Sequence, residues 1–183
     1  MKRILVSREV CSGCRACGVA CVAHHEGRFG RDAARIHVVK VEALGLDQPH
    51  VCRQCGATQG GALAPCVEAC PVGALRKDER TGAILVDTDP ASASACIGCA
   101  ACVDACPFGM AVLHPETGVA LICDLCGGDP ACVKRCATGA IVYAERGAGA
   151  RAPEGDARRP EWQRAFEHGL GLVHGLQERL DEA

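Results

Sequence analysis

Cysteine is the residue of this sequence best suited to chemistry, and its 16 copies fall into four groups of four. The first group has the spacing Cys-x2-Cys-x2-Cys-x3-Cys over residues 11–21, and the third repeats it over residues 96–106. Thiolates packed so closely are typical ligands of metal ions and iron–sulfur clusters. The groups are Cys11, Cys14, Cys17 and Cys21; Cys52, Cys55, Cys66 and Cys70; Cys96, Cys99, Cys102 and Cys106; Cys123, Cys126, Cys132 and Cys136.

Three chemistries compete for these thiols. Disulfides are disfavoured because the sequence has no recognisable export signal, so we expect a protein of the reducing cytoplasm. Structural zinc usually takes two separated pairs of ligands, which suits the second group but not the compact first and third. The compact spacing is the bacterial ferredoxin signature, in which three thiolates bind one cube and the fourth binds the other cluster of a pair. The sequence therefore predicts four [4Fe–4S] clusters.

The composition agrees with a core built around metal. Aromatic residues make up only 3% of the 183 residues, so ordinary apolar packing is limited and a metal centre would have to replace it. The net charge of −2 makes nucleic acid an improbable partner. No stretch of 18 apolar residues is present, so we expect no membrane span.

The prolines after the cysteine groups bear on which thiols share a cluster. Pro71 and Pro107 follow the second and third groups, whereas Val22 and Ala137 stand there in the first and fourth. This symmetry favours a nested arrangement, although sequential pairing of the groups stays open. The nested sets are Cys11, Cys14, Cys17 and Cys136; Cys21, Cys123, Cys126 and Cys132; Cys52, Cys55, Cys66 and Cys106; Cys70, Cys96, Cys99 and Cys102.

The elements that must position these thiols are short. Each cysteine group is expected to end in a helical turn, and the runs at 74–86 and 110–122 are expected to form hairpins. Strands are expected at 35–41 and 140–144. The predicted fold class is α+β, a duplicated bacterial dicluster ferredoxin-like fold with nested pairing and a C-terminal amphipathic helix. The polyferredoxin domain would span 1–144, with an inner unit at about 52–109 and an outer unit from 1–51 and 110–144.

The C-terminal region has a different character. Residues 145–160 are rich in Gly, Pro, Ala and charge and are expected to form a linker. Residues 161–183 carry an apolar stripe at helical spacing, which we call the docking tail. It would pack on its own domain, on another subunit or on a second copy of the chain. The stripe consists of Trp162, Phe166, Leu170, Val173, Leu176 and Leu180.

Outside the cysteines the sequence offers no catalytic constellation. No nucleophile triad, phosphate loop or dinucleotide fingerprint is present, so we expect no catalytic residue and no enzyme activity of this chain alone. The histidines lack metal-ligand spacing and are interpreted as surface residues or neighbours of cluster ligands. Cations beside the ligands could tune a cluster or guide docking. These residues are His24, His25, His37, His50 and His114, and Arg15, Arg53, Lys134 and Arg135.

Residues 1–145, with all 16 cysteines, resemble the four-cluster iron–sulfur electron-transfer subunits of multi-subunit oxidoreductases. The stretch CDLCGGDPACVKRCATGAI at 123–141 is similar to the ferredoxin subunits that accompany tungsten aldehyde oxidoreductases, and to the CO dehydrogenase ferredoxin. The resemblance implies nested ligation, a catalytic subunit that carries tungsten- or molybdenum-pterin, and a separate electron acceptor. The spacer at 56–65 is longer than in the small ferredoxin members.

Other functions remain open at this stage. The family also serves CO dehydrogenases, formate dehydrogenases, hydrogenases and membrane-bound reductases of the dimethyl sulfoxide type, any of which would change the catalytic partner. A freestanding soluble polyferredoxin would need no fixed partner, and the docking tail argues against it. A zinc-stabilised assembly scaffold would be colourless.

Overall fold

The structure, a computed structural model, describes residues 1–41, 45–56 and 62–145. The docking tail, the linker after Glu145 and much of the spacer at 56–65 lie outside these residues, so the predictions for them stay predictions. The described elements are β1 (Lys2–Val6), α1 (Ala16–Glu26), β2 (Ile36–Val41), β3 (Leu46–Val51), α2 (Pro65–Glu68), β4 (Leu75–Lys77), β5 (Ile84–Val86), α3 (Ala101–Asp104), β6 (Val112–Leu113), β7 (Ala120–Leu121), η2 (Leu125–Gly128), α4 (Ala131–Lys134) and β8 (Ile141–Glu145).

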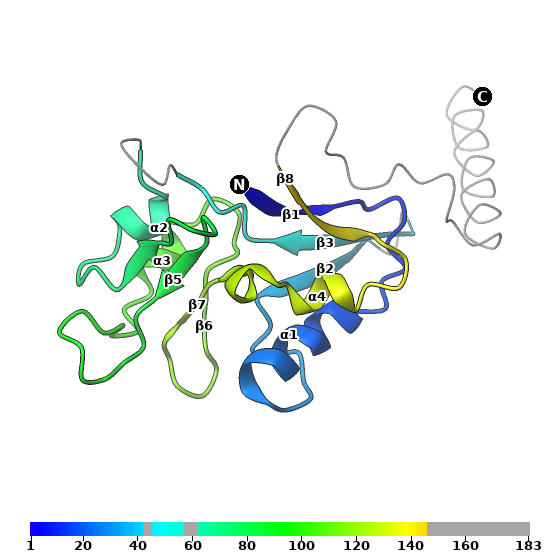
Figure 1. Cartoon of the computed structure of the whole chain (residues 1–183). Coiled ribbons are helices and arrows are strands. Elements are labelled where there is room, and N and C mark those ends of the chain that lie inside the picture. The colour runs from blue at the N-terminus through cyan, green and yellow to red at the C-terminus, as the bar shows by residue number, and fades with distance from the viewer. Residues whose placement is uncertain (42–44, 57–61, 146–183) are drawn as a thin grey trace, which may run out of the picture.

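The strands form antiparallel ribbons of two (Figure 1). The predicted hairpins at 74–86 and 110–122 are confirmed as β4–β5 and β6–β7, and the predicted strands are confirmed as β2 and β8. β1 pairs with β8, from Lys2 opposite Glu145 to Val6 opposite Ile141. The first and last described strands therefore lie side by side, as an outer unit closed by both ends of the chain requires.

Two strands escaped the sequence analysis for physical reasons. β1 is short and its partner lies more than a hundred residues away in the chain, so no local hairpin pattern marks it. β3 contains Asp47 and Pro49, which usually exclude a strand interior. In a two-stranded ribbon both strands are edges, and a proline facing away from the partner's hydrogen bonds is tolerated there. Pro49 is fully buried opposite Val38.

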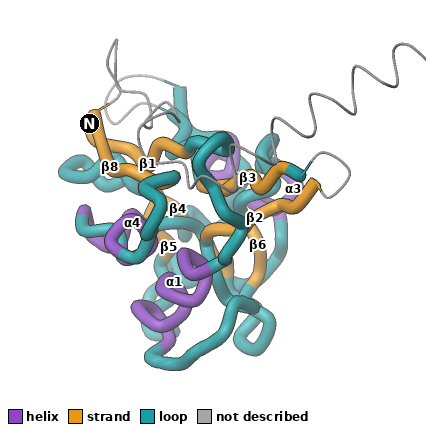
Figure 2. Tube along the Cα trace, turned by 90° about the vertical axis from the view of Figure 1, so that its right-hand side faces the viewer, coloured by secondary structure: helices purple, strands orange, loops and turns teal. Residues whose placement is uncertain are grey.

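The helices share one relation to the cysteines. Each of α1, α2, α3 and α4 has the third cysteine of its group as its second residue, and these four thiols are buried. Three helices are the single turns expected from the sequence, but α1 has 11 residues and ends at Gly27 with φ 64°. Because α1 continues through Cys21, it presents two ligands from one helix. α1 and α4 pack against each other under the β1–β8 ribbon (Figure 2).

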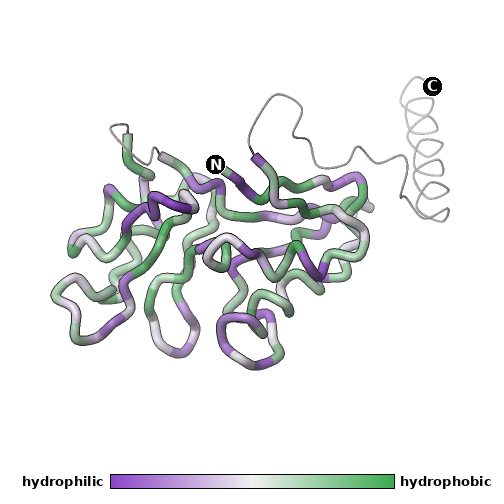
Figure 3. Tube along the Cα trace, viewed as in Figure 1, coloured by the Kyte–Doolittle hydropathy of each residue, from purple (hydrophilic) through white to green (hydrophobic). Residues whose placement is uncertain are grey.

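The core is divided into two clusters of buried side chains. One gathers Ile4, Val22 and Ile36 from the first part of the chain with Leu125 and Ile141 from the last. The other gathers residues between Ala64 and Ile122. The first cluster also takes in Ala83 and the second Ala111, Ala120 and Ile122, so the division follows the nested units only in part, and their bounds stay a prediction. Hydrophobic segments are short and spread over both units (Figure 3), and no helix of the described residues is long and apolar enough to cross a membrane.

Candidate iron–sulfur centres

One backbone conformation recurs in all four cysteine groups. The residue before the second cysteine and the residue after it have positive φ in every group. Gly supplies only one of the two positions each time, and the other is an L-residue held in the left-handed region, which costs about 1–2 kcal/mol. These pairs are Gly13 and Arg15, Gln54 and Gly56, Gly98 and Ala100, and Leu125 and Gly127. Strain repeated at four equivalent positions points to a shared task, which is to curl the loop around a bound group.

The thiols meet across the chain rather than within their own groups. Cys11, Cys14 and Cys136 lie near enough to Cys17 that their thiolate forms would raise the pKa of the Cys17 thiol. Since Cys136 belongs to the fourth group, this neighbourhood favours nested over sequential pairing. Likewise Cys21 and Cys126 act on Cys132, Cys55 and Cys106 on Cys52, and Cys96, Cys70 and Cys99 on Cys102.

Two of the predicted sets line cavities. Cys21, Cys123, Cys126 and Cys132 surround a cavity between β1, α1 and the loop before α4. Cys70, Cys96, Cys99 and Cys102 surround another beside the β6–β7 hairpin. In each cavity the four thiols come from two distant segments of the chain. Four soft sulfur donors around an enclosed space are the donor set of a [4Fe–4S] cluster.

Backbone N–H groups donate to two thiols that the nested arrangement assigns to the set of another group, Cys70 and Cys106. The N–H groups of Ala74 and Met110 donate to the Sγ atoms of Cys70 and Cys106, each over 3.3 Å. Burial alone would raise the pKa of the Cys106 thiol, but backbone N–H groups, led by Met110, outweigh it and lower the pKa. Such donors stabilise an anionic cluster and tune its potential.

Without iron most of these thiols would be neutral. Burial raises the pKa of Cys17, Cys52 and Cys66 to about 11 and that of Cys132 to about 12. Burial also raises the pKa of Cys123 well above its usual value. Thiolates at these places therefore need the positive charge of bound metal. The residues present fit the cluster on both the donor set and the charge it must supply.

The four sets form a linear series. Cys17 of the first set acts on Cys132 of the second, Cys52 of the third acts on Cys123 of the second, and Cys102 of the fourth acts on Cys66 of the third. Each set thus has a thiol beside the next set in line.

Gln54 joins the second and third sets and was missed by the sequence analysis. Its side chain is 1% exposed. Its Nε2 donates to the carbonyl of Cys123 over 2.6 Å, and its Oε1 accepts from the N–H of Ile84 over 2.9 Å. Only its place between two cysteines of a group could have singled it out.

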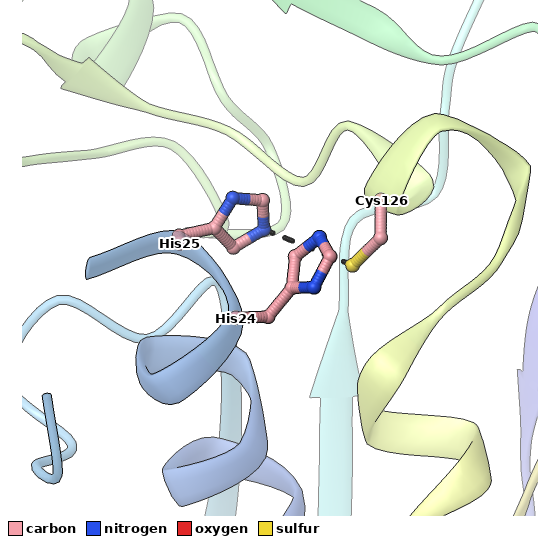
Figure 4. A group of neighbouring side chains, drawn as sticks. All are labelled: His24, His25 and Cys126. Carbon is pink, nitrogen blue, oxygen red and sulfur yellow. Dashed lines mark hydrogen bonds between the residues drawn. The ribbon is translucent and has the colours of Figure 1, made fainter. Parts of the chain in front are cut away.

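His24 and His25 lie at the end of α1 with their rings toward Cys126 (Figure 4). Their ring nitrogens and the Cys126 Sγ lie within 4.8 Å of one another, which makes them a group that could hold a metal ion. Because Cys126 also belongs to a cavity of four thiols, we interpret His25 as a neighbour of a cluster ligand, with Nε2 3.7 Å from Sγ. That agrees with the sequence interpretation, whereas His114 is buried away from the thiols and bonds Glu116 and Thr117 in its hairpin turn.

Comparison with known proteins decides the family. Residues 45–146 match the family described as a 4Fe-4S dicluster domain, which is more than half of the chain. This chain belongs to the 4Fe-4S dicluster family. The matched part of the dicluster protein contains the second, third and fourth cysteine groups, and the total of 16 cysteines is the number that four [4Fe–4S] clusters require.

Relatives of this chain include named subunits of oxidoreductases. It is 44% identical over 133 residues to the "Aliphatic sulfonate oxidoreductase, polyferredoxin-like subunit" of Pyrococcus furiosus, covering 73% of this chain and 70% of that protein. It is 37% identical over 147 residues to the "Thiosulfate reductase electron transfer subunit PhsB" of Salmonella typhi, covering 76% of this chain and 73% of that protein. The chain is therefore an iron–sulfur electron-transfer subunit of the type found in multi-subunit oxidoreductases.

A solved structure is also similar, though loosely. The "Active site complex BamBC of Benzoyl Coenzyme A reductase in complex with Zinc" overlays with a TM-score of 0.45 at 24% identity. The overlay covers 94% of this chain and 89% of the matched chain. So loose an overlay carries no weight for the fold or partner of the dicluster protein.

The curled loop of the third group can be tested with a matched pair of glycines. Gly98 has φ +68° and an added Cβ would lie 2.7 Å from the carbonyl oxygen of Gly118, whereas Gly109 has φ +61° and nothing within 4 Å. We expect Gly109→Ala to lower stability by about 1–2 kcal/mol, from left-handed strain alone. Gly98→Ala should lower it clearly more, because the backbone must also move.

The measurement is the temperature at which the iron–sulfur absorbance of each anaerobic variant is lost. Equal losses in Gly98→Ala and Gly109→Ala would show that the contact with Gly118 has no influence on the loop.

Proposed function

We propose that this chain relays single electrons through four [4Fe–4S] clusters between a catalytic subunit and a redox partner. When bound, each cluster can accept one electron and give it up again, so a two-electron oxidation in the partner is divided into single steps. The proposed ligands are the nested sets given above. The division into a polyferredoxin domain at 1–144, a linker and a docking tail is part of the same proposal.

The linear series of thiol sets is the observation that carries this proposal. Successive sets have thiols near enough for a thiolate of one to raise the pKa of the other, as for Cys17 and Cys132, Cys52 and Cys123, and Cys102 and Cys66. A storage protein or a scaffold has no need of such an order, whereas a relay needs each site beside the next.

The protein itself would orient the thiolates, hold the clusters in place and shield them from water. The left-handed loops aim the first two thiolates of each group, and the buried helix starts fix the third. Backbone N–H groups such as those of Ala74 and Met110 stabilise negative charge on sulfur, and burial of Cys123 and Cys132 keeps water away. Cys14 and Cys99 are the exposed thiols, one in the first set and one in the last. Electrons would enter and leave near these two.

For the catalytic partner we propose a tungsten- or molybdenum-pterin subunit of the aldehyde oxidoreductase type, in the cytoplasm. The resemblance of residues 123–141 supports this choice. The relative from Pyrococcus furiosus carries the name of an oxidoreductase for aliphatic sulfonates, which supports an oxidoreductase partner but widens the range of substrates. The docking tail would bind that partner, an electron-accepting subunit or a second copy of the chain.

Metal analysis of the complex tests the proposal. The tagged chain would be purified from its native host without oxygen, and its metals measured against protein. We expect about 4 × 4 = 16 irons per chain, with tungsten or molybdenum in the co-purified subunit. Nickel would replace the proposed partner with a CO dehydrogenase or hydrogenase, and iron alone would favour a freestanding polyferredoxin. Zinc in place of iron would overturn the electron relay.

A further inference from the structure

The cavity of the second thiol set is lined by an arginine, two of whose guanidinium nitrogens are buried without a hydrogen-bond partner. Arg35 stands directly before β2 and lines the cavity with Cys21, Cys126 and Cys132. Its Nε and Nη1 have no hydrogen-bond partner and no contact with solvent. Among the described residues, these are the buried side-chain nitrogen or oxygen atoms that lack a partner. An arginine keeps its charge in proteins, and an uncompensated buried charge is strongly destabilising.

The missing counter-charge is in the cavity itself. The backbone N–H of Arg35 donates to the Cys21 Sγ over 3.4 Å, so the residue is anchored to a proposed ligand. Its positive charge acts on both Cys21 and Cys126 and favours their thiolate forms. Four thiolates carry more negative charge than the iron core neutralises, and reduction adds to the excess. A bound cluster would therefore supply the negative charge that the Nε and Nη1 atoms of Arg35 lack.

The carboxylates around the cavity act on the thiols in the opposite sense to Arg35. The negative charge of Asp124 raises the pKa of Cys126 more than the positive charge of Arg35 lowers it. At Cys21 the effect of Arg35 on the pKa is the larger of the two. The Asp124 side chain is 31% exposed and its carboxylate binds the Cys126 N–H, so water and the amide screen it. His25 Nε2 lies 3.4 Å from Asp124 Oδ1, but burial lowers the pKa of His25, so the ring adds no positive charge near neutral pH. Asp129 also acts on Cys126, as the smallest of these charges.

The fourth set provides an internal comparison. Its cavity is lined by Cys70, Cys96, Cys99 and Cys102 together with Val72, Leu75, Ile97, Gly98, Ala100, Leu113 and Ala120, none of which is charged. The two enclosed sets thus share a donor type, whereas the cation of Arg35, together with Asp124 and His25, lines the second cavity alone. Such a cation lowers the energy of the more negative, reduced form, and in a medium of low dielectric constant this effect is large.

We propose that Arg35 is a positioning residue that raises the reduction potential of the cluster held by Cys21, Cys123, Cys126 and Cys132, so that electrons collect at this second place of the series. This inference rests on the proposed function. It goes further by assigning one step of the relay to one side chain. A relay with a collecting site near its middle holds an electron until the partner accepts it.

Redox titration of the purified four-cluster chain tests this proposal. Arg35→Met removes the charge and keeps much of the volume, whereas Arg35→Lys keeps the charge. Arg31→Met is the matched control, because Arg31 is exposed in the same loop and has the same charge. Midpoint potentials are read by electron paramagnetic resonance during stepwise reduction. The cluster that disappears in Cys132→Ala identifies the second set.

We expect Arg35→Met to shift that one midpoint to more negative potential and to leave the other three unchanged. Arg35→Lys should shift it much less, and Arg31→Met not at all. Unchanged potentials in an Arg35→Met chain with full iron would overturn the proposal, and so would an equal shift in Arg31→Met or a shift of another cluster. If Arg35→Met does not assemble four clusters, Arg35→Gln, which keeps amide donors, takes its place under the same criteria. Failure of the proposed function is seen separately, as a wild-type chain without about 16 irons.

Discussion

Replacing Cys136 with alanine will change the cluster held by the first cysteine group, more than a hundred residues away, and leave the third group's cluster intact. In the nested arrangement Cys136 completes the set of Cys11, Cys14 and Cys17, whose charges act on one another in the folded chain. In sequential pairing Cys136 would complete the set of the third group. The chain therefore loses, or retains in altered form, one cluster whose identity separates the two arrangements.

Double variants make this test independent of how a damaged cluster behaves. Cys136→Ala with Cys14→Ala affects two ligands of one proposed set, so no further cluster should be lost beyond the single variant and about 12 of 16 irons should remain. Cys136→Ala with Cys99→Ala affects two proposed sets, so only about 8 irons should remain. Both are read by iron analysis and by the number of distinct resonance signals. The reverse pattern would exclude nested ligation.

Much of this architecture could be predicted because it depends on local spacing. The hairpins at β4–β5 and β6–β7, the strands β2 and β8, and the helical turns at the cysteines are confirmed, and each is encoded within a dozen residues. The prolines after Cys70 and Cys106 favoured the nested sets, which stay a prediction. β1 and β3 were missed because one depends on a distant partner and the other contains a proline that only a two-stranded ribbon tolerates.

The residues around the thiols were harder to predict, since their roles depend on contacts made across the fold. The second and fourth groups have irregular spacing, and nothing in Gln54 or Leu125 as residue types indicates a left-handed conformation, yet both adopt it. Arg35 is one of many arginines in the sequence, and only the fold brings it to the cavity of Cys132 and Cys126. The proposed ligands thus follow from the sequence pattern, whereas the groups proposed to tune them depend on contacts that only the fold makes.

Replacing Gln54 with alanine will destabilise both units of the chain together. The substitution leaves two buried backbone groups without partners, the carbonyl of Cys123 and the N–H of Ile84. An unsatisfied buried group costs about 1–3 kcal/mol, so the expected loss of stability is about 2–6 kcal/mol. Gln48→Ala in β3 is the control, because it removes the same amide from a half-buried position without a described hydrogen bond. The measurement is the guanidinium concentration at which half of the cluster absorbance is lost without oxygen.

The pattern of that loss matters as much as its size. Ile84 lies in β5 of the proposed inner unit, whereas Cys123 belongs to a set of the outer unit, and the Gln54 side chain is hydrogen-bonded to both. If Gln54 joins the units, the clusters of the second and third sets should become labile in the same transition. Equal midpoints for Gln54→Ala and Gln48→Ala, or loss of clusters from one unit alone, would mean that the two units are joined elsewhere and that the series of thiol sets does not depend on this residue.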